Sequence, residues 1–562
     1  MMNSKSILQT ASGGQTKVPN GWMPATGGRS FIFQDPAILW LNLFGETQGF
    51  TKDTSPYEFL DFISEKGREF ERKWISEMAN EAVRVCEKEY EVREVIKLEQ
   101  TLEFIKEQVP LIAGAAIWWA PEKIYGVPDL LVHTTWLQEH FPELELPRNQ
   151  PDHYVVFDMK FTTKLDSTQK KLSFVNYSIQ NRIYSYIIGQ LVSVMPTYSF
   201  LICRDRITNP LMVDIRSEVG KPLDEDICKI RDKYLDIKLN GSSYTPWTHD
   251  QVCINLMNDQ DDPWHSAKLD IARNKIPGGD TTLVYEIGQK QKEDLAINGF
   301  TNRDSLLARE PNDIPLELCY RLGAAKCPRI RAVLKANRTG EITPTSISIV
   351  PTIKPFEFFV DFETFNNLNV DFDKQWPTLD GCEMIFMIGV GWCYNNEWKF
   401  EVFIAEEESH DAEREMLFKF LSFLNEKTKD NLLDPEVSVL YHWTSAEIWQ
   451  LRNAANRHGL DEGHPLQKLP WFDLQKDVFL EEPIGVPGAW SYGLKNIATA
   501  LKLVDWPGDL GDGLRATVAG WKAYQTTSPL ESDEMRIIIE YNEVDCRALY
   551  EILSWMRKVK KA

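Results

Sequence analysis

The chain has 562 residues, a formal net charge of −21 at pH 7, 43% hydrophobic residues and 26% charged residues. This length exceeds one ordinary hydrophobic core and indicates about two to four globular domains. The acidic balance argues against a general polyanion binder, but it allows local basic sites and acid clusters that hold metal ions. No apolar run is long enough to span a bilayer, and the nine cysteines include no CxxC pair. We therefore expect a cytoplasmic protein without membrane association and without an iron–sulfur cluster.

The N-terminal half shows an α/β pattern. Residues 1–28 are rich in Ser, Gly, Thr and Gln, and we expect them to form a flexible tail. Helical periodicity covers 59–85 and 174–192. Strand-like runs lie at 111–119, 130–133, 154–157 and 198–203. These elements predict an α/β domain over residues 29–275.

A helical region and a second α/β pattern follow. Residues 276–338 show short helical segments, and 339–355 place prolines among β-branched residues, which is typical of a linker. From Phe356 onward we expect strands at 357–362, 384–392, 398–404 and 437–441, and helices at 411–427, 444–458, 493–502 and 533–558. The chain is therefore predicted to contain a helical connector over 276–338, a linker over 339–355 and a C-terminal α/β domain over 356–562.

Two carboxylates spaced one residue apart mark the first strand of the C-terminal domain. Asp361 and Glu363 share one face of that strand, because side chains alternate along it. Adjacent acids repel each other unless a cation lies between them, and a divalent metal ion is the simplest solution. Glu447 opens a later helix, and Tyr541 and Asp545 lie four residues apart on one face of the last helix. We expect these side chains to meet at one edge of a sheet.

This set is the one that two-metal cleavage of phosphodiesters requires. Asp361-x-Glu363 and Tyr541-xxx-Asp545, with a strand-to-helix acid between them, resemble the exonuclease motifs of the DnaQ-type DEDDy nucleases, which have a ribonuclease H-like fold. The resemblance extends to the ribonuclease H-like domain that is joined to RecB-like nucleases in one bacterial and archaeal family. Two further stretches that resemble this domain are 471–474 and 491–495.

The resemblance implies an exonuclease that trims single strands from the 3′ end. Tyr541 would orient the attacking water. The second motif usually supplies Asp, so Asp473 is an alternative to Glu447. Trp443 and Trp449 flank Glu447 and are the tryptophans most suited to stacking on bases. The implied ligands of two Mg²⁺ or Mn²⁺ ions are Asp361, Glu363, Glu447 and Asp545.

A second acid cluster lies in the N-terminal domain. Asp129 precedes a strand-like run, and Asp158 and Lys160 share one face at the end of another. Aspartates bind Mg²⁺ through hard oxygen atoms. A nearby lysine can orient water or stabilise the negative charge that develops on a phosphoryl group. This pattern resembles the PD-(D/E)xK signature of restriction-endonuclease-like nucleases.

Two outlying motifs place the resemblance in the RecB-like branch of that group. Gln180-xxx-Tyr184 resembles its QxxxY motif, and Gly67-xxx-Glu71 resembles its upstream helix motif. Residues 276–338 resemble a helix-hairpin-helix segment. The resemblance implies one or two metal ions held by Glu71, Asp129 and Asp158. The residues implied to complete the catalytic set are Lys160, Gln180 and Tyr184.

These patterns predict a metal-dependent nuclease that joins two nuclease domains. The substrate class is nucleic acid, with single-stranded or end-containing DNA favoured and RNA left open. A helicase or other processing partner, and the polarity of the N-terminal site, also stay open. Two alternatives stand beside this hypothesis. In one, a single site is active and the other domain binds substrate; in the other, the protein is a non-catalytic nucleic-acid-binding scaffold.

Overall fold

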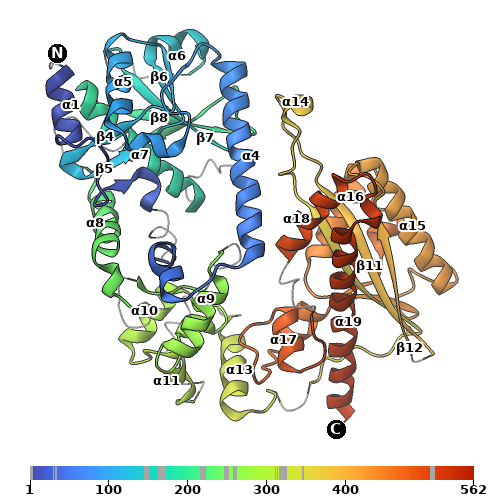
Figure 1. Cartoon of the computed structure of the whole chain (residues 1–562). Helices are drawn as coiled ribbons and strands as arrows, with labels where there is room; N and C mark the ends of the chain where they lie inside the picture. The colour runs from blue at the N-terminus through green and yellow to red at the C-terminus, as the bar shows by residue number, and fades with distance from the viewer. Residues whose placement is uncertain are drawn as a thin grey trace. The chain divides into compact units, whose positions relative to one another are not determined.

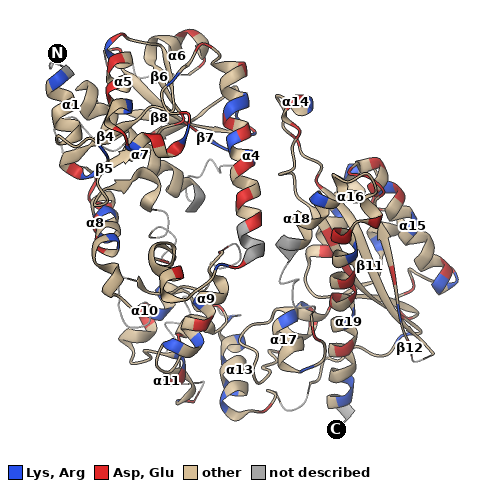
Figure 2. Cartoon of the chain, in the orientation of Figure 1, with Lys and Arg blue, Asp and Glu red and all other residues tan. Residues whose placement is uncertain are grey.

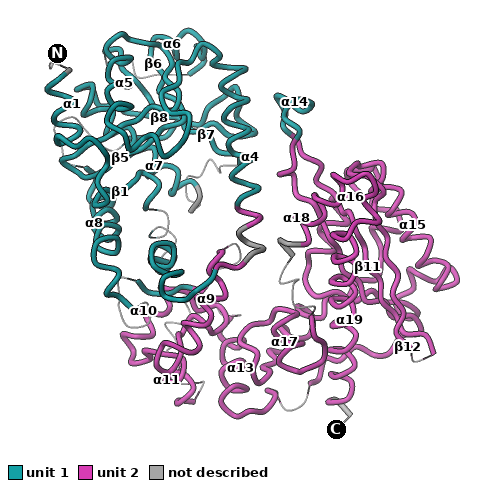
Figure 3. The backbone as a smooth tube through the Cα atoms, in the orientation of Figure 1, with its two compact units in different colours: residues 1–51, 61–255, 371–379 teal, residues 52–60, 256–370, 380–562 magenta. Residues whose placement is uncertain are grey.

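Figure 1 shows a computed structural model of the chain. It describes all residues except 1–3, 29–30, 32–34, 145–150, 163–171, 216–222, 246–251, 257–261, 311, 313, 315–325, 345–346, 396, 507–512 and 562. The side chains of 4, 54–57, 172–173, 513–515 and 560–561 are also not described. The chain divides into two compact units (Figure 3). Unit 1 comprises Met1–Thr51, Asp61–Asn255 and Asp371–Leu379, and unit 2 comprises Lys52–Leu60, Leu256–Val370 and Asp380–Ala562.

Unit 1 is built on a six-stranded mixed sheet with the strand order β2-β3-β6-β7-β8-β9. The strands are β2 (Val83–Arg84), β3 (Leu111–Ala113), β6 (Leu130–His133), β7 (Tyr154–Lys160), β8 (Tyr198–Cys203) and β9 (Leu211–Asp214). The strands β6 and β8 are buried at every residue. This burial explains why their sequences are continuous apolar runs rather than alternating ones. Helix α7 (Leu172–Val192) packs on β7 and β8.

The first residues of the chain differ from the predicted flexible tail. Helix α1 (Ser4–Ser12) and strand β1 (Met23–Pro24) order this segment. Met23 pairs with Ile124 of β5 (Ile124–Gly126), in a small sheet that also contains β4 (Ile117–Trp119). The prediction was wrong because a few apolar side chains in a polar segment are enough to anchor it; the buried ones include Ala11, Trp22 and Met23.

Unit 2 contains a five-stranded sheet with the order β12-β11-β10-β13-β14. Its strands are β10 (Phe356–Phe365), β11 (Met384–Tyr394), β12 (Glu397–Ile404), β13 (Ser438–His442) and β14 (Trp471–Asp473). The central strand β10 pairs antiparallel with β11 and parallel with β13. Helix α19 (Asp533–Lys561), red in Figure 1, packs on β10 and β11, and α15 (His410–Thr428) packs on β11 and β12. Further helices of this region are α16 (Ala446–Arg457), α17 (Leu494–Ala500) and α18 (Gly513–Tyr524).

The predicted connector and linker share a hydrophobic core with the C-terminal sheet. The connector helices are α10 (Gln289–Ile297), α11 (Arg303–Leu307) and α13 (Lys326–Thr339). One of the short helical segments predicted in this region, 316–322, lies outside the described residues. One cluster of buried side chains joins both regions and includes Ile287, Leu295, Val333, Phe359 and Leu549. Ile347 and Val350 of the predicted linker are buried in the same cluster, and Thr343 forms a β-bridge with Gly485. Residues 339–355 are therefore not a free linker.

Membrane insertion was not expected from the sequence. In the part of the chain that the structure describes, no helix combines the length and apolarity that crossing a bilayer requires.

A buried charge network fastens α15 and α16 to the sheet of unit 2. The Glu413 carboxylate is fully buried and accepts hydrogen bonds from Arg457 at 2.8 Å, His458 at 2.8 Å and the Ile385 backbone N–H at 2.7 Å. Burial alone would raise the pKa of Glu413, but the hydrogen bonds from His458 and Arg457 outweigh it and hold the pKa below its usual value. The charged form of Glu413 therefore stabilises the fold.

Glu413→Ala should lower the free energy of unfolding by about 3–5 kcal/mol, because it leaves Arg457 without its buried counter-charge. A depressed carboxylate pKa contributes stability above its unfolded value, and this stability is lost as pH falls through the folded value. The difference between wild type and variant should therefore shrink in acid. Urea denaturation measures it, with exposed Glu415→Ala on the same helix as the control, expected to change stability by less than about 0.5 kcal/mol. Equal losses in both variants would contradict the network's role.

Candidate functional sites

The central strand of unit 2 carries the first two predicted acids toward helix α19. The Asn542 side chain donates to Asp361 Oδ2 at 2.8 Å and to Glu363 Oε1 at 3.5 Å. Gly389 on β11 is in register with Asp361. A Cβ atom at Gly389 would lie 1.7 Å from Asn542 Oδ1. The absence of a side chain at this position lets α19 approach the two acids closely.

The other predicted acids reach the same region from two helices. Asp545 and Tyr541 lie on α19, and the Trp506 indole N–H donates to Asp545 Oδ1 at 2.8 Å. Glu447 lies in the first turn of α16, just after β13 ends, and its Oε2 lies 3.2 Å from His442 Nδ1. His442 is completely buried and supports Glu447 from the strand end.

The carboxylates of this cluster disfavour one another's ionisation. Burial raises the pKa of Asp361, and repulsion from Asp545, Glu363 and Glu447 adds to it. Burial together with Asp545 raises the pKa of Glu363 to about 8. Burial raises the pKa of Asp545 to about 6, although the Trp506 hydrogen bond and Lys495 oppose this shift. The four acids thus lie within electrostatic reach of one another, and a cation would be needed to keep all of them ionised near neutral pH.

Two further residues, Lys495 and Asn542, lie beside the acid cluster, and the sequence had suggested no role for either of them. Lys495 Nζ lies 4.6 Å from the ring centroid of Tyr541 and opposes the raised pKa of Glu363. Burial and then repulsion from Asp545 raise the pKa of the Tyr541 hydroxyl, which stays protonated and can donate a hydrogen bond. Asn542 could have been suspected, because it lies three residues before Asp545 on the helix. Lys495 ends the stretch 491–495 that resembles the ribonuclease H-like domain, but nothing in its local spacing links it to Tyr541.

Asp473 lies near Glu447 but at the end of a strand one step further from β10: burial raises the pKa of Asp473, and repulsion from Glu447 adds to this shift. Strand β13 lies between β10 and β14, and Asp473 at the end of β14 is in register with His442. Its Oδ1 accepts from the Lys476 N–H at 2.8 Å. Glu447 repels Asp361 and Asp545 directly, as their raised pKa values reflect. Of the two candidate second-motif acids, Glu447 follows β13, the strand next to β10, whereas Asp473 ends β14, one strand further from β10.

The predicted residues of the N-terminal domain also come together. Asp158 on β7 is fully buried; its Oδ1 lies 2.9 Å from Lys160 Nζ and accepts a hydrogen bond from Gln180 Nε2 at 3.3 Å. Gln180 Nε2 also lies 3.1 Å from the Tyr184 hydroxyl. Asp158 Oδ2 is buried and has no hydrogen-bond partner among the described residues. An ionised oxygen in this position calls for a further cationic partner.

Asp129 and Glu71 border the same cluster. Asp129 Oδ2 accepts from the Met159 N–H at 2.6 Å, which ties the loop before β6 to β7. Glu71, on helix α4 (Thr54–Met78), lies 3.4 Å from Arg84. A Cβ atom at Gly126, just before Asp129, would lie 2.3 Å from the Tyr184 ring. Glycine is thus required there for Tyr184 to pack under this loop.

Electrostatics in the N-terminal cluster parallel those of the C-terminal one. Burial and repulsion from Asp129 raise the pKa of Glu71 to about 7. Burial raises the pKa of Asp158 to about 7, because repulsion from Asp129 adds to it while Lys160 only partly opposes it. Burial alone would lower the pKa of Lys160, but Asp158 and Asp129 raise it, so the lysine stays charged.

The donor atoms of both clusters suit a hard divalent cation. Carboxylate oxygens are the preferred ligands of Mg²⁺ and Mn²⁺, and the unpartnered Asp158 Oδ2 fits such an ion. As they stand, no three or more His, Cys, Asp or Glu side chains in the described part of the chain are arranged to hold a metal ion. Asp361, Asp545 and Glu447 have hydrogen-bond partners within the protein. Binding an ion would therefore require carboxylate side chains to turn.

Because the carboxylate pKa values are raised in the folded protein, we expect the stability of the fold to depend on pH. A folded-state pKa above the unfolded one favours folding at low pH, and this contribution is lost as pH rises through the folded value. In EDTA, the melting temperature of wild type should thus fall between about pH 5 and 8 relative to Glu363→Gln, which stays neutral at position 363. Mg²⁺ should stabilise wild type more than the variant. Thermal melts over this pH range measure both effects; a constant difference between the two proteins would contradict the prediction.

Comparison with known proteins identifies the C-terminal region. Residues 377–557 match a family model described as the RNase_H superfamily. No curated protein and no solved structure matches the chain. The chain therefore contains a C-terminal RNase H-like domain, which indicates a nuclease-type or nucleic-acid-related function, and RNase H-like nucleases generally use divalent metal ions. The matched stretch includes Glu447, Tyr541 and Asp545, and begins after the strand that carries Asp361 and Glu363.

Proposed function

From the RNase H-like domain, we propose that this protein is a metal-dependent nuclease with two sites, one in each unit. The observation that carries the proposal is the clustering of four acids and a protonated tyrosine around the central strand of the C-terminal sheet. Buried acids that repel one another destabilise a fold, and a scaffold that only binds nucleic acid has no use for them. We infer that the C-terminal site is a DEDDy-type 3′–5′ exonuclease and that DNA is its main substrate.

The C-terminal residues have separate roles in this proposal. Divalent ions held here would supply Lewis-acid chemistry, lowering the pKa of water and offsetting the charge of the phosphate. Asp361, Glu363, Glu447 and Asp545 would bind them, and Tyr541 would orient the attacking water through its hydroxyl. Water adds to phosphorus, and the bond to the leaving 3′ oxygen breaks as that oxygen gains a proton. Asn542 and His442 position Asp361 and Glu447.

The N-terminal site follows the same chemistry with a different charge pattern. Glu71, Asp129 and Asp158 would hold one or two ions in a PD-(D/E)xK arrangement. Lys160 remains charged beside Asp158 and stabilises negative charge that develops on the phosphoryl group. Gln180 positions Asp158 and contacts Tyr184.

A time course on end-labelled single- and double-stranded DNA and RNA tests the proposal. Each substrate is incubated with the full-length protein and Mg²⁺, Mn²⁺ or EDTA. We expect cleavage with either metal ion and none in EDTA, with a ladder that shortens from the 3′ end of single-stranded DNA. Full activity in EDTA, or no cleavage of any substrate with either ion, would reject the nuclease proposal.

A further inference from the structure

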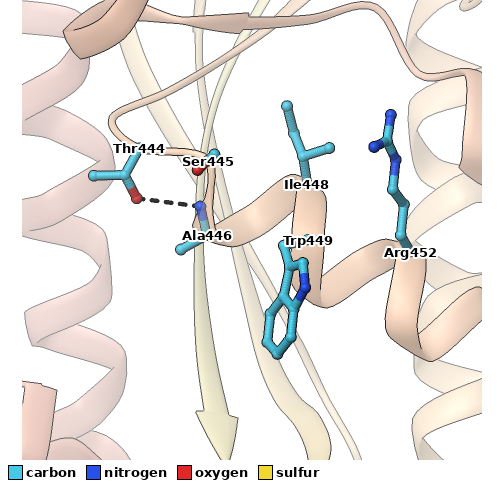
Figure 4. Close-up of a pocket in the computed structure, with 6 residues that line it drawn as sticks. All are labelled: Thr444, Ser445, Ala446, Ile448, Trp449 and Arg452. Atoms are coloured by element: carbon cyan, nitrogen blue, oxygen red, sulfur yellow. Dashed lines mark hydrogen bonds between the residues drawn. The ribbon is translucent and has the colours of Figure 1, made fainter. Parts of the chain in front are cut away.

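A pocket opens on helix α16, beside the proposed exonuclease site. Its volume is about 470 Å³, and the residues that line it are Thr444, Ser445, Ala446, Ile448, Trp449 and Arg452 (Figure 4). This volume lies within the usual range of small-ligand sites. The pocket begins at the same N-terminal turn of α16 that carries Glu447, so the pocket and the acid cluster share one end of this helix.

The lining residues form one stripe of the helix. Ser445, Ile448, Trp449 and Arg452 follow the i, i+3, i+4, i+7 spacing of a single face. Glu447 points to the opposite, buried side, where it meets His442. The stripe is thus a surface that the acids do not occupy. Figure 4 shows Ile448 and Arg452 extending to one side of the turn and the Trp449 indole to the other.

Two side chains of the stripe are unusual for an exposed helix face. Trp449 is 57% exposed, whereas its neighbour Trp443 is buried and donates its indole N–H to Tyr492 O at 3.0 Å. Of these two tryptophans, Trp449 is therefore the one available for stacking on a ligand. Arg452 has no ion-pair or hydrogen-bond partner among the described residues. The chain as a whole has a formal net charge of −21 at pH 7, and acidic and basic residues are interspersed along α4 and α19 (Figure 2).

We propose that this pocket binds one unpaired nucleotide of a single-stranded substrate, with its base stacked on Trp449 and a neighbouring phosphate on Arg452. An exposed indole accepts the π-face of any base, and a planar guanidinium matches phosphate geometry. The ligand is a DNA or RNA strand whose 3′ end occupies the acid cluster, so the inference rests on the proposed function. The pocket would thus bind single strands independently of their base sequence.

The test compares binding and trimming by the full-length protein. The variants are Trp449→Ala, Trp449→Phe, Arg452→Ala and Arg452→Lys, and the controls are Tyr394→Ala, which removes an aromatic side chain that is 62% exposed, and Arg536→Ala. Fluorescence anisotropy in EDTA measures the affinity for short single strands, and trimming in Mg²⁺ gives kcat/KM. Trp449→Ala should lose about 5- to 100-fold in affinity, and Trp449→Phe should recover most of it. Arg452→Ala should reduce the log–log salt slope of binding by about one.

Strands with one missing base identify the stacked nucleotide. The abasic position is moved stepwise from the 3′ end. At one position, the missing base should weaken binding by wild type as strongly as the substitution Trp449→Ala does. The strand with that missing base should bind to the Trp449→Ala variant no more weakly than the intact strand does. Losses at every position that are equal in wild type and Trp449→Ala would overturn the proposal.

The readouts separate this inference from the proposed function. If wild type trims strands and Trp449→Ala binds and trims equally well, the nuclease proposal stands and the pocket proposal is wrong. If wild type cleaves nothing, the nuclease proposal fails, and the affinity measured in EDTA still decides the role of Trp449. Absence of single-strand binding by wild type, or the same loss in the control variants, also overturns the pocket proposal.

Discussion

Asp545→Ala should abolish 3′ trimming, whereas Tyr541→Phe should slow it by roughly 10²–10³-fold. The two substitutions differ because the residues would have different roles. Asp545 would be a ligand in a cluster whose charge only a cation can balance, so its removal should abolish metal binding together with turnover. Tyr541→Phe removes one hydroxyl and keeps the ring that lies beneath Lys495, so folding and metal binding should persist.

Single-turnover trimming of a 5′-labelled strand measures both rates, and calorimetry measures metal binding. Tyr550→Phe removes a hydroxyl elsewhere on the same helix and serves as the matched control, with an expected rate close to wild type. Substrate affinity should change little in Tyr541→Phe. Trimming by Tyr541→Phe at the wild-type rate would make Tyr541 a packing residue, and Asp473 and His442 would then be tested as the groups that orient water.

Asp158→Asn should abolish cleavage at the N-terminal site and leave 3′ trimming unchanged. Asp361→Asn should have the opposite effect. The two acids lie in different compact units, and no residue of one proposed site belongs to the unit of the other. Asn keeps the size of Asp158 but removes the charge that offsets Lys160 and would hold a metal ion. We therefore expect complete loss of one activity in each variant.

Two substrates distinguish these activities. A single strand with a blocked 3′ end, or a closed circle, reports cleavage that does not need a 3′ end, and a 5′-labelled open strand reports trimming. Exposed Asp152→Asn is the control for loss of one charge in unit 1. Thermal melts establish that each variant is folded. If either substitution abolishes both activities in a folded protein, the two sites act as one catalytic unit.

The local pattern of apolar residues was sufficient to predict the helices and strands in which that pattern is strong. The strands predicted at 130–133 and 198–203 coincide with β6 and β8, and the helix predicted at 174–192 falls within α7. The predicted strand at 111–119 is instead two strands, because Gly114 has a φ of 58° and turns the chain between them. Helix α18 and strand β14 were not predicted. Strand β14 has 3 residues, and such a short strand carries little periodicity.

The sequence by itself determined where the acids lie. Alternation along β10 places Asp361 and Glu363 on one face, and helical spacing pairs Tyr541 with Asp545. The match over 377–557 confirms the RNase H-like part of the resemblance, while the RecB-like domain and the DnaQ-type assignment stay predictions.

Only the tertiary structure decided what surrounds the acids and where the units end. Asn542 reaches Asp361 because Gly389, distant in sequence, leaves room for it, and Lys495 reaches Tyr541 from another helix. The connector and the predicted linker joined the C-terminal core in the same way, through contacts such as those of Ile347. Periodicity reports the side of an element that becomes buried, but it does not report which distant residue buries it, because that choice depends on shape and charge brought together by the whole fold.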